Sequence, residues 1–365
     1  MIDCDVHQNF NRLADLLPWL DPQYRDFVEH GGFGGLGLPN YPWVHPGGFT
    51  MNEADPADGG VAGSEYGTLC EQLLDRQGVE YAILTGEEIL NVSCLPHPQL
   101  AAALATAYNR WLIEQWLARD ERLRGSLVIA SQDAPRAAQE IRAFGEHPQI
   151  VQVILSGGAP AGYGDMRYEP ILDAAVELGL PVAIHVGAEG LGMNPPPTAT
   201  GHPAYYVEWH TLLPAAAQSH LVSLICRGAF ARRPELRLVL VEAGVSWLPS
   251  LLWRLDANWK ALRSEIPWVR EPPSETVSRQ VRFTTQPLEQ PADHRHLRQA
   301  LEMIDGIEHV LMYASDYPHW DFDPATLIRS RLPREWRDRI MSENARELYR
   351  LPVAKPSAAP DPVRA

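Results

Sequence analysis

Three consecutive patterns between residues 150 and 186 predict the fold: IVQVIL at Ile150–Leu155, EPILDAAVEL at Glu169–Leu178 and VAIHV at Val182–Val186. The first and third runs are nearly all apolar and rich in β-branched residues, which is typical of strands buried on both faces. The middle run spaces its apolar residues three or four apart, and Gly179 and Pro181 follow it, which predicts a helix that ends there. The three runs together predict a parallel β-α-β unit.

The same alternation extends outward in both directions along the chain. Further strands are predicted at Ile2–Val6, Tyr81–Thr85, Gly125–Ala130, Leu236–Glu242, Val281–Thr285 and Val310–Ser315. Further helices are predicted at Tyr66–Gln77, Gln99–Arg119, Pro135–Phe144, Glu208–Ala229, Trp247–Arg263, Asp293–Asp305 and Pro333–Arg350. Eight strands that alternate with helices indicate the α/β class and, within it, a (β/α)8 TIM barrel.

Two segments fall outside this alternation. Residues 8–64 contain the run GGFGGLGLPNYPWVHPGG and little periodicity, so we expect a long loop insertion after strand 1, at the end of the barrel where active sites form. Residues 353–365 are rich in Pro and Ala, and we expect a disordered C-terminal tail. The remainder predicts one barrel domain over residues 1–352.

Composition limits the partners and the location. The chain has 365 residues and a formal net charge of −15, which argues against nucleic acid and anionic membranes as partners. None of the four cysteines forms a C-x-x-C pair, as expected in a reducing cytoplasm. The chain shows neither a signal-peptide pattern nor an apolar run long enough to cross a membrane, so we expect a cytoplasmic protein.

Polar residues at the carboxyl ends of the predicted strands suggest a metal site. Asp5 and His7 end the first strand and point the same way, because side chains alternate along a strand. His185 lies in the fifth strand, Glu242 ends the sixth and Asp316 follows the eighth. A lone histidine in an apolar strand is more often a core residue. Convergence of several ligand-type residues on one barrel mouth favours a divalent metal instead.

These motifs resemble those of the amidohydrolase superfamily, in the branch of the aminocarboxymuconate-semialdehyde decarboxylases and related amidohydrolase-2 proteins. The resemblance covers residues 1–351. It depends on D-x-D-x-H at Asp3–His7, VAIHVG around His185, the run GAFARRPELRLVLVEAGVSWLPSLLWRLD, the motif ASDYPH around Asp316 and the closing ENARELY.

The resemblance implies a ligand set of Asp5, His7, His185 and Asp316, with Asp316 also accepting a proton. Two positions depart from the common pattern: Asp5 stands where relatives usually have His, and Glu242 stands where many have a strand-6 His. No lysine suited to carbamylation follows strand 4 in VILSGGAP. We therefore expect one divalent ion, Zn²⁺ or Mn²⁺. Beside Asp316, the expected catalytic residues are Glu242 and His319.

The first expectation for function is a metal-dependent hydrolase that attacks a small cyclic or carboxylated compound through metal-activated water. The alternative is a non-oxidative decarboxylase that uses the same site, and a third possibility is a non-catalytic binding barrel. The partner is a small molecule. The aromatic segment 205–209 and the insertion offer apolar surface, which leads us to expect a homodimer. Five further residues could line the pocket or have purely structural roles: Glu189, Glu208, His210, Trp43 and His45.

Overall fold

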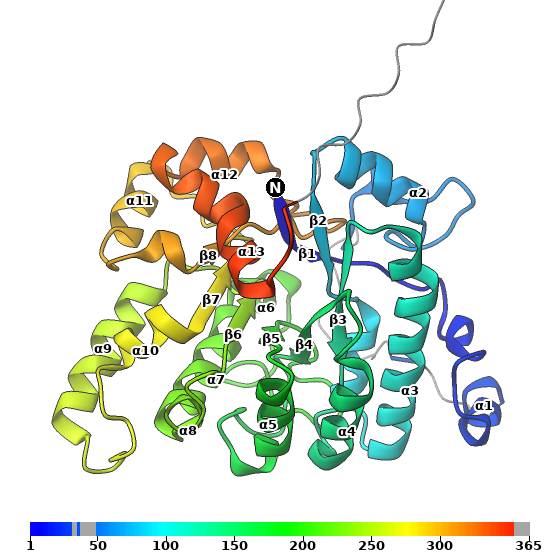
Figure 1. Cartoon of the computed structure of the whole chain (residues 1–365), viewed down its shortest axis with the longest axis horizontal. Helices are drawn as coiled ribbons and strands as arrows, with labels where there is room; N and C mark the ends of the chain where they lie inside the picture. The colour runs from blue at the N-terminus through cyan, green and yellow to red at the C-terminus, as the bar shows by residue number, and fades with distance from the viewer. Residues whose placement is uncertain (31–34, 37–48, 354–365) are drawn as a thin grey trace, which may run out of the picture.

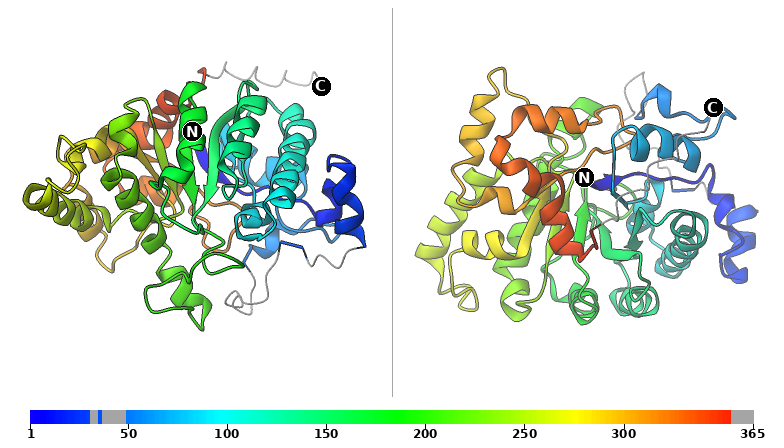
Figure 2. Two further views of the ribbon diagram at one scale, coloured as in Figure 1. Left: turned by 90° about the horizontal axis from the view of Figure 1, so that it is seen from below. Right: turned by 45° about the horizontal axis from the view of Figure 1, so that its top comes forward.

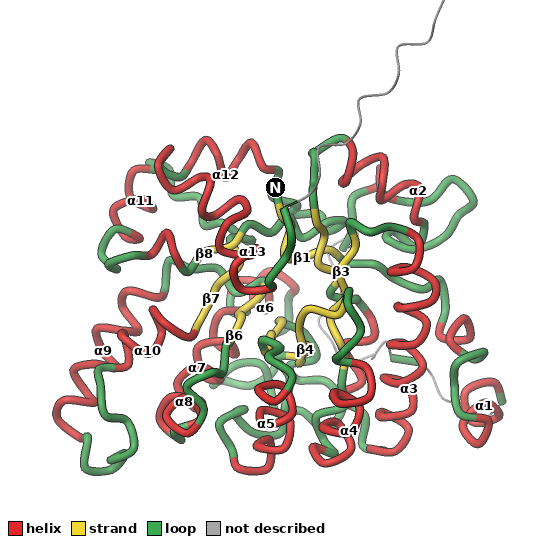
Figure 3. The backbone as a smooth tube through the Cα atoms, in the orientation of Figure 1, coloured by secondary structure: helices red, strands yellow, loops and turns green. Residues whose placement is uncertain are grey.

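The computed structural model of the chain describes residues 1–30, 35–36 and 49–353, and its centre is an eight-stranded parallel sheet (Figure 1). The strands follow one another in sequence order: β1 Ile2–Val6, β2 Tyr81–Leu84, β3 Leu123–Val128, β4 Ile150–Ser156, β5 Val182–His185, β6 Leu238–Val241, β7 Val281–Thr284 and β8 Leu311–Met312. The strands lie at the centre and the helices surround them (Figure 3). The predicted (β/α)8 TIM barrel is confirmed.

The barrel is nearly closed where the chain after the last strand meets the first strand. β8 is only two residues long, but the chain that follows it continues to pair with β1. The Cys4 amide donates to the Tyr313 carbonyl at 2.9 Å, and the Asp316 amide donates to the Asp5 carbonyl at 3.1 Å. The regular ladder is shorter than the predicted Val310–Ser315 because the Tyr313 amide turns to the carbonyl of Ile340 instead.

Helices cover the outside of the sheet. Their bounds are α2 Tyr66–Leu69, α3 Pro98–Trp111, α4 Ala134–Phe144, α5 Glu169–Glu177, α6 Tyr206–Thr211, α7 Pro214–Cys226, α8 Ala229–Arg232, α9 Leu248–Leu262, α10 Pro273–Gln280, α11 Arg295–Leu301, α12 Ala325–Arg331 and α13 Asn344–Tyr349. Local sequence sets their starts: Asp133, for example, accepts a hydrogen bond from the Arg136 amide and so caps α4.

Short 3-10 and π turns complete or extend several helices: η1 Leu13–Leu16, η2 Asn52–Ala54, η3 Cys70–Asp75, η4 Glu88–Cys94, η5 Leu112–Trp116, η6 Leu117–Arg119, η7 Met166–Tyr168, η8 Ile307–His309, η9 Arg334–Trp336 and η10 Arg339–Glu343. The helix predicted over Glu208–Ala229 is wrong as one element, because Pro214 interrupts it and begins a new helix. The helices α10 and α12 were not predicted.

The insertion after β1 is partly helical. Its helix α1, Pro22–Glu29, starts at an Asp21 cap and lies at the edge of the molecule (Figure 2, dark blue). Residues Trp43 and His45, like the tail from residue 354 onward, lie outside the described residues. Within the described residues, no helix combines the length and the apolar character that a membrane span requires.

The end of the insertion returns to the barrel mouth. Thr50 forms an antiparallel bridge with His319, which follows β8. The Met51 amide donates to the Pro318 carbonyl at 2.9 Å, and the Trp320 amide donates to the Phe49 carbonyl at 2.8 Å. The first and the last loops of the barrel are therefore joined through their backbones directly above the strand ends.

The end of β3 depends on one buried side chain. β2 ends early, at the level of Gly125, and leaves the backbone of Val128 without a strand partner on that side. Asn109 of α3, fully buried, replaces that partner: its Nδ2 donates to the Val128 carbonyl at 2.8 Å, and its Oδ1 accepts from the Val128 amide at 3.0 Å.

We expect Asn109→Ala to lower the free energy of unfolding by about 2–4 kcal/mol, because it leaves two buried backbone groups unpaired. Urea denaturation followed by circular dichroism measures the effect. The control is the exposed Asn52→Ala, for which a change within about 0.5 kcal/mol is expected. Equal losses in the two variants would contradict the role given to Asn109.

Candidate metal centre

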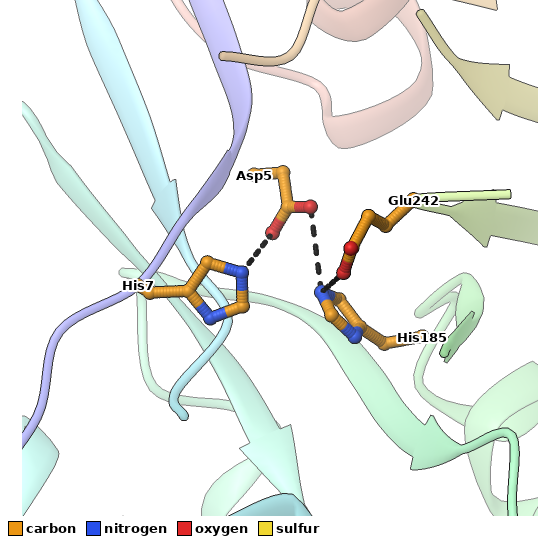
Figure 4. A group of neighbouring side chains, drawn as sticks. All are labelled: Asp5, His7, His185 and Glu242. Atoms are coloured by element: carbon orange, nitrogen blue, oxygen red, sulfur yellow. Dashed lines mark ion pairs between the residues drawn. The ribbon is translucent and has the colours of Figure 1, made fainter. Parts of the chain in front are cut away.

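Three strands deliver four polar side chains to one point at the mouth of the barrel. Asp5 comes from β1 and His7 from the residue after it, His185 from the end of β5 and Glu242 from the residue after β6 (Figure 4). All four are buried. Parallel strands all end at the same mouth of the barrel, so β1 and the adjacent pair β5 and β6 bring these residues together although neither the sequence nor the strand order places them side by side.

The distances within this group suit a shared ion. Asp5 Oδ2 lies 3.4 Å from His185 Nε2, and Asp5 Oδ1 lies 3.6 Å from His7 Nε2. His185 Nε2 also lies 3.5 Å from Glu242 Oε2 (Figure 4). One ligand atom from each of the four residues lies within 4.8 Å of the others. Two ligands of one ion can be at most about 4.4 Å apart, since each metal–ligand bond is about 2.2 Å. A small inward adjustment would therefore let all four reach one cation.

Asp316 belongs to a second group that overlaps the first. It comprises His7, Glu242, Asp316 and His319, again with ligand atoms within 4.8 Å. Asp316 Oδ1 lies 2.9 Å from His7 Nε2 and 2.8 Å from His319 Nδ1. The four ligands expected from the sequence are thus divided between two groups that share His7 and Glu242. Glu242 and His319 lie beside the expected ligands.

Each of the four expected ligands has one buried atom without a hydrogen bond of good geometry among the described residues. These atoms are Asp5 Oδ2, His7 Nε2, His185 Nε2 and Asp316 Oδ1. A buried polar atom left in this state costs about 1–3 kcal/mol. Two imidazole nitrogens and two carboxylate oxygens form a donor set that Zn²⁺ and Mn²⁺ both accept. The residues present therefore fit one divalent ion.

Both histidines are fixed through their other ring nitrogen. His185 Nδ1 donates to the Val186 carbonyl at 2.6 Å. His7 Nδ1 donates to the Gly86 carbonyl, and Glu87 Oε2 lies 2.9 Å from the same nitrogen. Because Nδ1 carries the proton in each ring, Nε2 presents its lone pair to the centre, as a metal ligand requires.

Both aspartates are fixed through their second oxygen. Thr85 Oγ1 donates to Asp5 Oδ1 at 2.7 Å, and Gln286 Nε2 donates to Asp316 Oδ2 at 2.9 Å. Thr85 and Gln286 follow β2 and β7, so strands without a ligand supply the residues that orient the ligands.

Two of the site residues have a strained backbone. Glu242 has φ 53° and Asp316 has φ 62°, in the left-handed region that side chains other than glycine rarely adopt. A hydrogen bond from the Glu242 amide to Thr284 Oγ1, at 3.0 Å, holds the first of these turns. Such strain is concentrated at functional sites, where it aims a side chain that the strand itself would point elsewhere.

The electrostatics of the site favour a cation. Burial and then the carboxylates of Asp316 and Asp321 raise the pKa of Glu242 well above its ordinary value. Burial lowers the pKa of His319, but Asp316 and Glu87 outweigh it and raise that pKa well above the ordinary value. Both shifts have the same origin, a surplus of carboxylates in a low dielectric, and either protons or a metal ion relieve it.

A cavity of about 610 Å³ opens directly over the group. His7, His185 and Glu242 line it at the strand ends, and its walls include the aromatic side chains Phe10, Phe49, Tyr206 and Trp209. This size and this mixture of apolar walls with a few polar groups are typical of sites for small organic ligands.

Two of the further residues expected near the pocket have structural roles, and a third lies beside the cavity. Glu208 accepts hydrogen bonds from the amides of Ala204 and Tyr205 and so caps α6. Glu189 accepts from the Gly187 amide at 2.8 Å behind the cavity wall, and burial raises its pKa to about 7. His210 Nε2 lies 3.3 Å from Asp321 Oδ2, beside the cavity.

Sequence reasoning missed four residues of the site: Thr85, Glu87, Gln286 and Asp321. Glu87 contacts both His7 and His319, and Asp321 lines the cavity and accepts from Gln286 Nε2 at 3.0 Å. The same reasoning about polar residues after strand ends, applied to the second and seventh strands, would have indicated Thr85, Glu87 and Gln286.

Solved structures share the fold along nearly the whole chain. An amidohydrolase from Mycobacterium avium subsp. paratuberculosis K-10 has 20% identity and a TM-score of 0.67, over 96% of this chain and 98% of that one. A 5-carboxyvanillate decarboxylase from Sphingomonas paucimobilis has 22% identity and a TM-score of 0.63, over 96% and 99%. A dihydroxybenzoic acid decarboxylase from Polaromonas sp. JS666, with bound manganese and the inhibitor 2-nitroresorcinol, has 16% identity and a TM-score of 0.66, over 97% and 98%.

Sequence comparison gives the family. No curated protein is similar enough in sequence to count as a match. The family model described as amidohydrolase matches residues 95–351, which include β3 to β8 with His185, Glu242 and Asp316. The resemblance found in the motifs is confirmed, and the chain belongs to the amidohydrolase family.

Proposed function

We propose that this enzyme is a metal-dependent, non-oxidative decarboxylase of a small aromatic carboxylate, with one divalent ion, Mn²⁺ or Zn²⁺. The observation that carries the proposal is the convergence of four buried ligand atoms, each without a good hydrogen bond, at the floor of a cavity with aromatic walls. The ion would be held by Asp5, His7, His185 and Asp316.

We favour decarboxylation over hydrolysis as the reaction for two reasons. Two of the similar structures named above are decarboxylases of aromatic acids, and one of these contains manganese. The cavity walls of Phe10, Phe49, Tyr206 and Trp209 suit a planar ring. The third similar structure is described only as an amidohydrolase, without a substrate, so hydrolysis, the first expectation from the sequence, has weaker support.

The chemistry follows from the groups around the cavity. A divalent ion at this position supplies a Lewis acid that holds and polarises an oxygen of the substrate. The bond between the ring carbon and its carboxylate breaks, the electron pair stays on the ring carbon, and a proton replaces the departing CO2. Glu242 and His319 line the cavity beside the expected metal ligands, and a carboxyl or imidazole group there can transfer a proton to the ring carbon. We assign the proton transfer to this pair, together with Asp316, which contacts His319.

The homodimer and the cytoplasmic location remain predictions. An exposed apolar surface is consistent with the homodimer, because the side chains of Tyr205 and Val207 near α6 are 69% and 70% exposed.

Metal content tests the ligand set. We expect about one Mn²⁺ or Zn²⁺ per wild-type chain by elemental analysis, and loss of most of it in His185→Ala, because one of four ligands is removed. The control, His309→Ala, removes a half-exposed histidine outside the site and keeps its metal. A wild-type protein that binds neither ion, or a His185→Ala variant with full occupancy, would contradict the proposed centre.

Isotopic labelling tests the reaction. Metal-loaded protein in D2O is incubated with a panel of hydroxybenzoates, and CO2 and the aromatic product are measured. We expect one CO2 per product and one deuterium at the carbon that lost the carboxylate. Incorporation of ¹⁸O from labelled water into a product, without release of CO2, would identify a hydrolase instead.

Glu242→Gln separates proton transfer from metal binding. The substitution preserves the shape of the side chain and removes its acidic proton, so we expect full metal content and a kcat lower by about 10²–10⁴-fold. Glu146→Gln, on the exposed surface of the molecule, is the control with unchanged kcat. Loss of metal in Glu242→Gln would show that Glu242 is a ligand.

A further inference from the structure

Asp321 is a cavity residue that the proposed reaction does not use. It lies in the loop after β8, beyond Asp316, and it lines the cavity at the mouth of the barrel. Its side chain is only 14% exposed. A carboxylate in such a place needs hydrogen-bond donors, because burial removes most of the water that would otherwise supply them.

One oxygen of this carboxylate is held by two groups of the protein. Gln286 Nε2 donates to Asp321 Oδ2 at 3.0 Å, and His210 Nε2 lies 3.3 Å from the same oxygen. Gln286 follows β7, whereas His210 belongs to α6. Two separate elements therefore fix the position of the carboxylate through Oδ2 alone.

The other oxygen of Asp321 remains available as an acceptor. In the part of the chain that the structure describes, Asp321 Oδ1 has no hydrogen-bond or ion-pair partner. A carboxylate oxygen can accept two hydrogen bonds. Because Asp321 lines the cavity, Oδ1 can accept a hydrogen bond from a molecule that is bound there.

Gln286 also sets the position of Asp321 relative to the expected metal ligands. Its Nε2 donates to Asp316 Oδ2 at 2.9 Å as well, so one amide nitrogen joins a metal ligand to Asp321. A ring whose carboxylate occupies the metal centre therefore has Asp321 close to it. The aromatic side chains of Tyr206 and Trp209, from α6, line the same cavity and can contact the face of that ring.

We infer that Asp321 is a substrate-binding residue that accepts a hydrogen bond from a hydroxyl or amino group on the ring. This inference rests on the proposed function for the place of the substrate carboxylate, at the metal ligands. It adds a residue that determines specificity: ring substituents that donate a hydrogen bond to Asp321 Oδ1 favour binding, and substituents that cannot donate leave that oxygen without a partner.

The test compares two series of probes that differ in one donor group. The 2-, 3- and 4-aminobenzoates carry a small group that donates hydrogen bonds, and the corresponding fluorobenzoates carry a small group that cannot. Dissociation constants are measured by isothermal titration of the Mn²⁺-loaded full-length protein, at a slightly alkaline pH at which the aromatic amino group is uncharged. We expect at least one aminobenzoate to bind about tenfold or more tightly than its fluoro counterpart.

Asp321→Asn reverses the polarity of this position. Gln286 Nε2 has to keep its hydrogen bond to Asp316 Oδ2, so the new amide must turn its oxygen toward Gln286 and its NH2 group toward the cavity. An amino group on the ring then meets a donor instead of an acceptor. We expect the preference for the aminobenzoate to fall by about tenfold or more.

Two further variants complete the comparison. Asp321→Ala removes the acceptor without introducing a donor, and the ratio of the two affinities should approach one. The matched control is Asp305→Asn, an equivalent substitution at an exposed position, which should keep the wild-type ratio. Manganese content is measured for each variant and should stay at the wild-type value, because Asp321 is not among the expected ligands.

Three results would overturn the inference. The first is a wild-type protein that prefers none of the aminobenzoates. The second is a preference that persists in both Asp321→Asn and Asp321→Ala. The third is loss of manganese in both variants, which would show that Asp321 supports the metal centre and not the substrate.

The outcome is separable from that of the proposed function. A preference for an aminobenzoate that depends on Asp321, without CO2 release from any benzoate, would contradict the decarboxylase and leave this inference standing. Release of CO2 by a protein that does not distinguish amino from fluoro substituents would support the decarboxylase and overturn the role of Asp321.

Discussion

The site depends on the backbone pairing that joins the end of the barrel to its beginning. The Asp316 amide donates to the Asp5 carbonyl at 3.1 Å, and the His7 amide donates to the Tyr317 carbonyl at 2.7 Å. These two hydrogen bonds fix the position of the segment with Asp316 relative to the segment with Asp5 and His7. Since β8 itself is only two residues long, they and not a regular ladder set the distance between the Asp316 carboxylate and the His7 ring.

A second constraint is electrostatic. Asp5, Glu242 and Asp316 converge with few positive groups to balance them, an arrangement that costs free energy in a buried site unless a cation joins it. The residues behind them, Thr85 and Gln286, satisfy only the outward-facing oxygens. The protein thus holds the inner atoms ready for a cation instead of pairing them within the fold. The free energy of folding is less favourable at this site, and the same arrangement makes the site able to bind a cation.

Much of this architecture could be predicted from the sequence. The strand Ile2–Val6 was predicted with its observed bounds, and the alternation of apolar and amphipathic runs was enough for the barrel. The convergence of Asp5, His7 and His185 followed from one rule, that parallel strands end at one edge. The prediction of a single helix over Glu208–Ala229 was wrong. The apolar periodicity continues across Pro214, but the helical hydrogen bonding does not, so two helices form.

Other features were beyond reach of a linear pattern. The left-handed backbone of Glu242 and Asp316 depends on tertiary contacts, so no local preference announces it. Glu87 belongs to the site only because it contacts two histidines from distant parts of the chain, His7 and His319. The insertion likewise has no periodicity that would predict the bridge between Thr50 and His319.

The pairing of the first and last strands also governs when the site can exist during synthesis. A ribosome makes β1, with Asp5 and His7, long before Asp316 and His319, which follow β8. Until then Asp5 and His7 have neither Asp316 nor the closing hydrogen bonds to set their geometry. The proposed set of Asp5, His7, His185 and Asp316 can therefore bind an ion together only in the finished barrel, so occupancy of that complete set marks the end of folding.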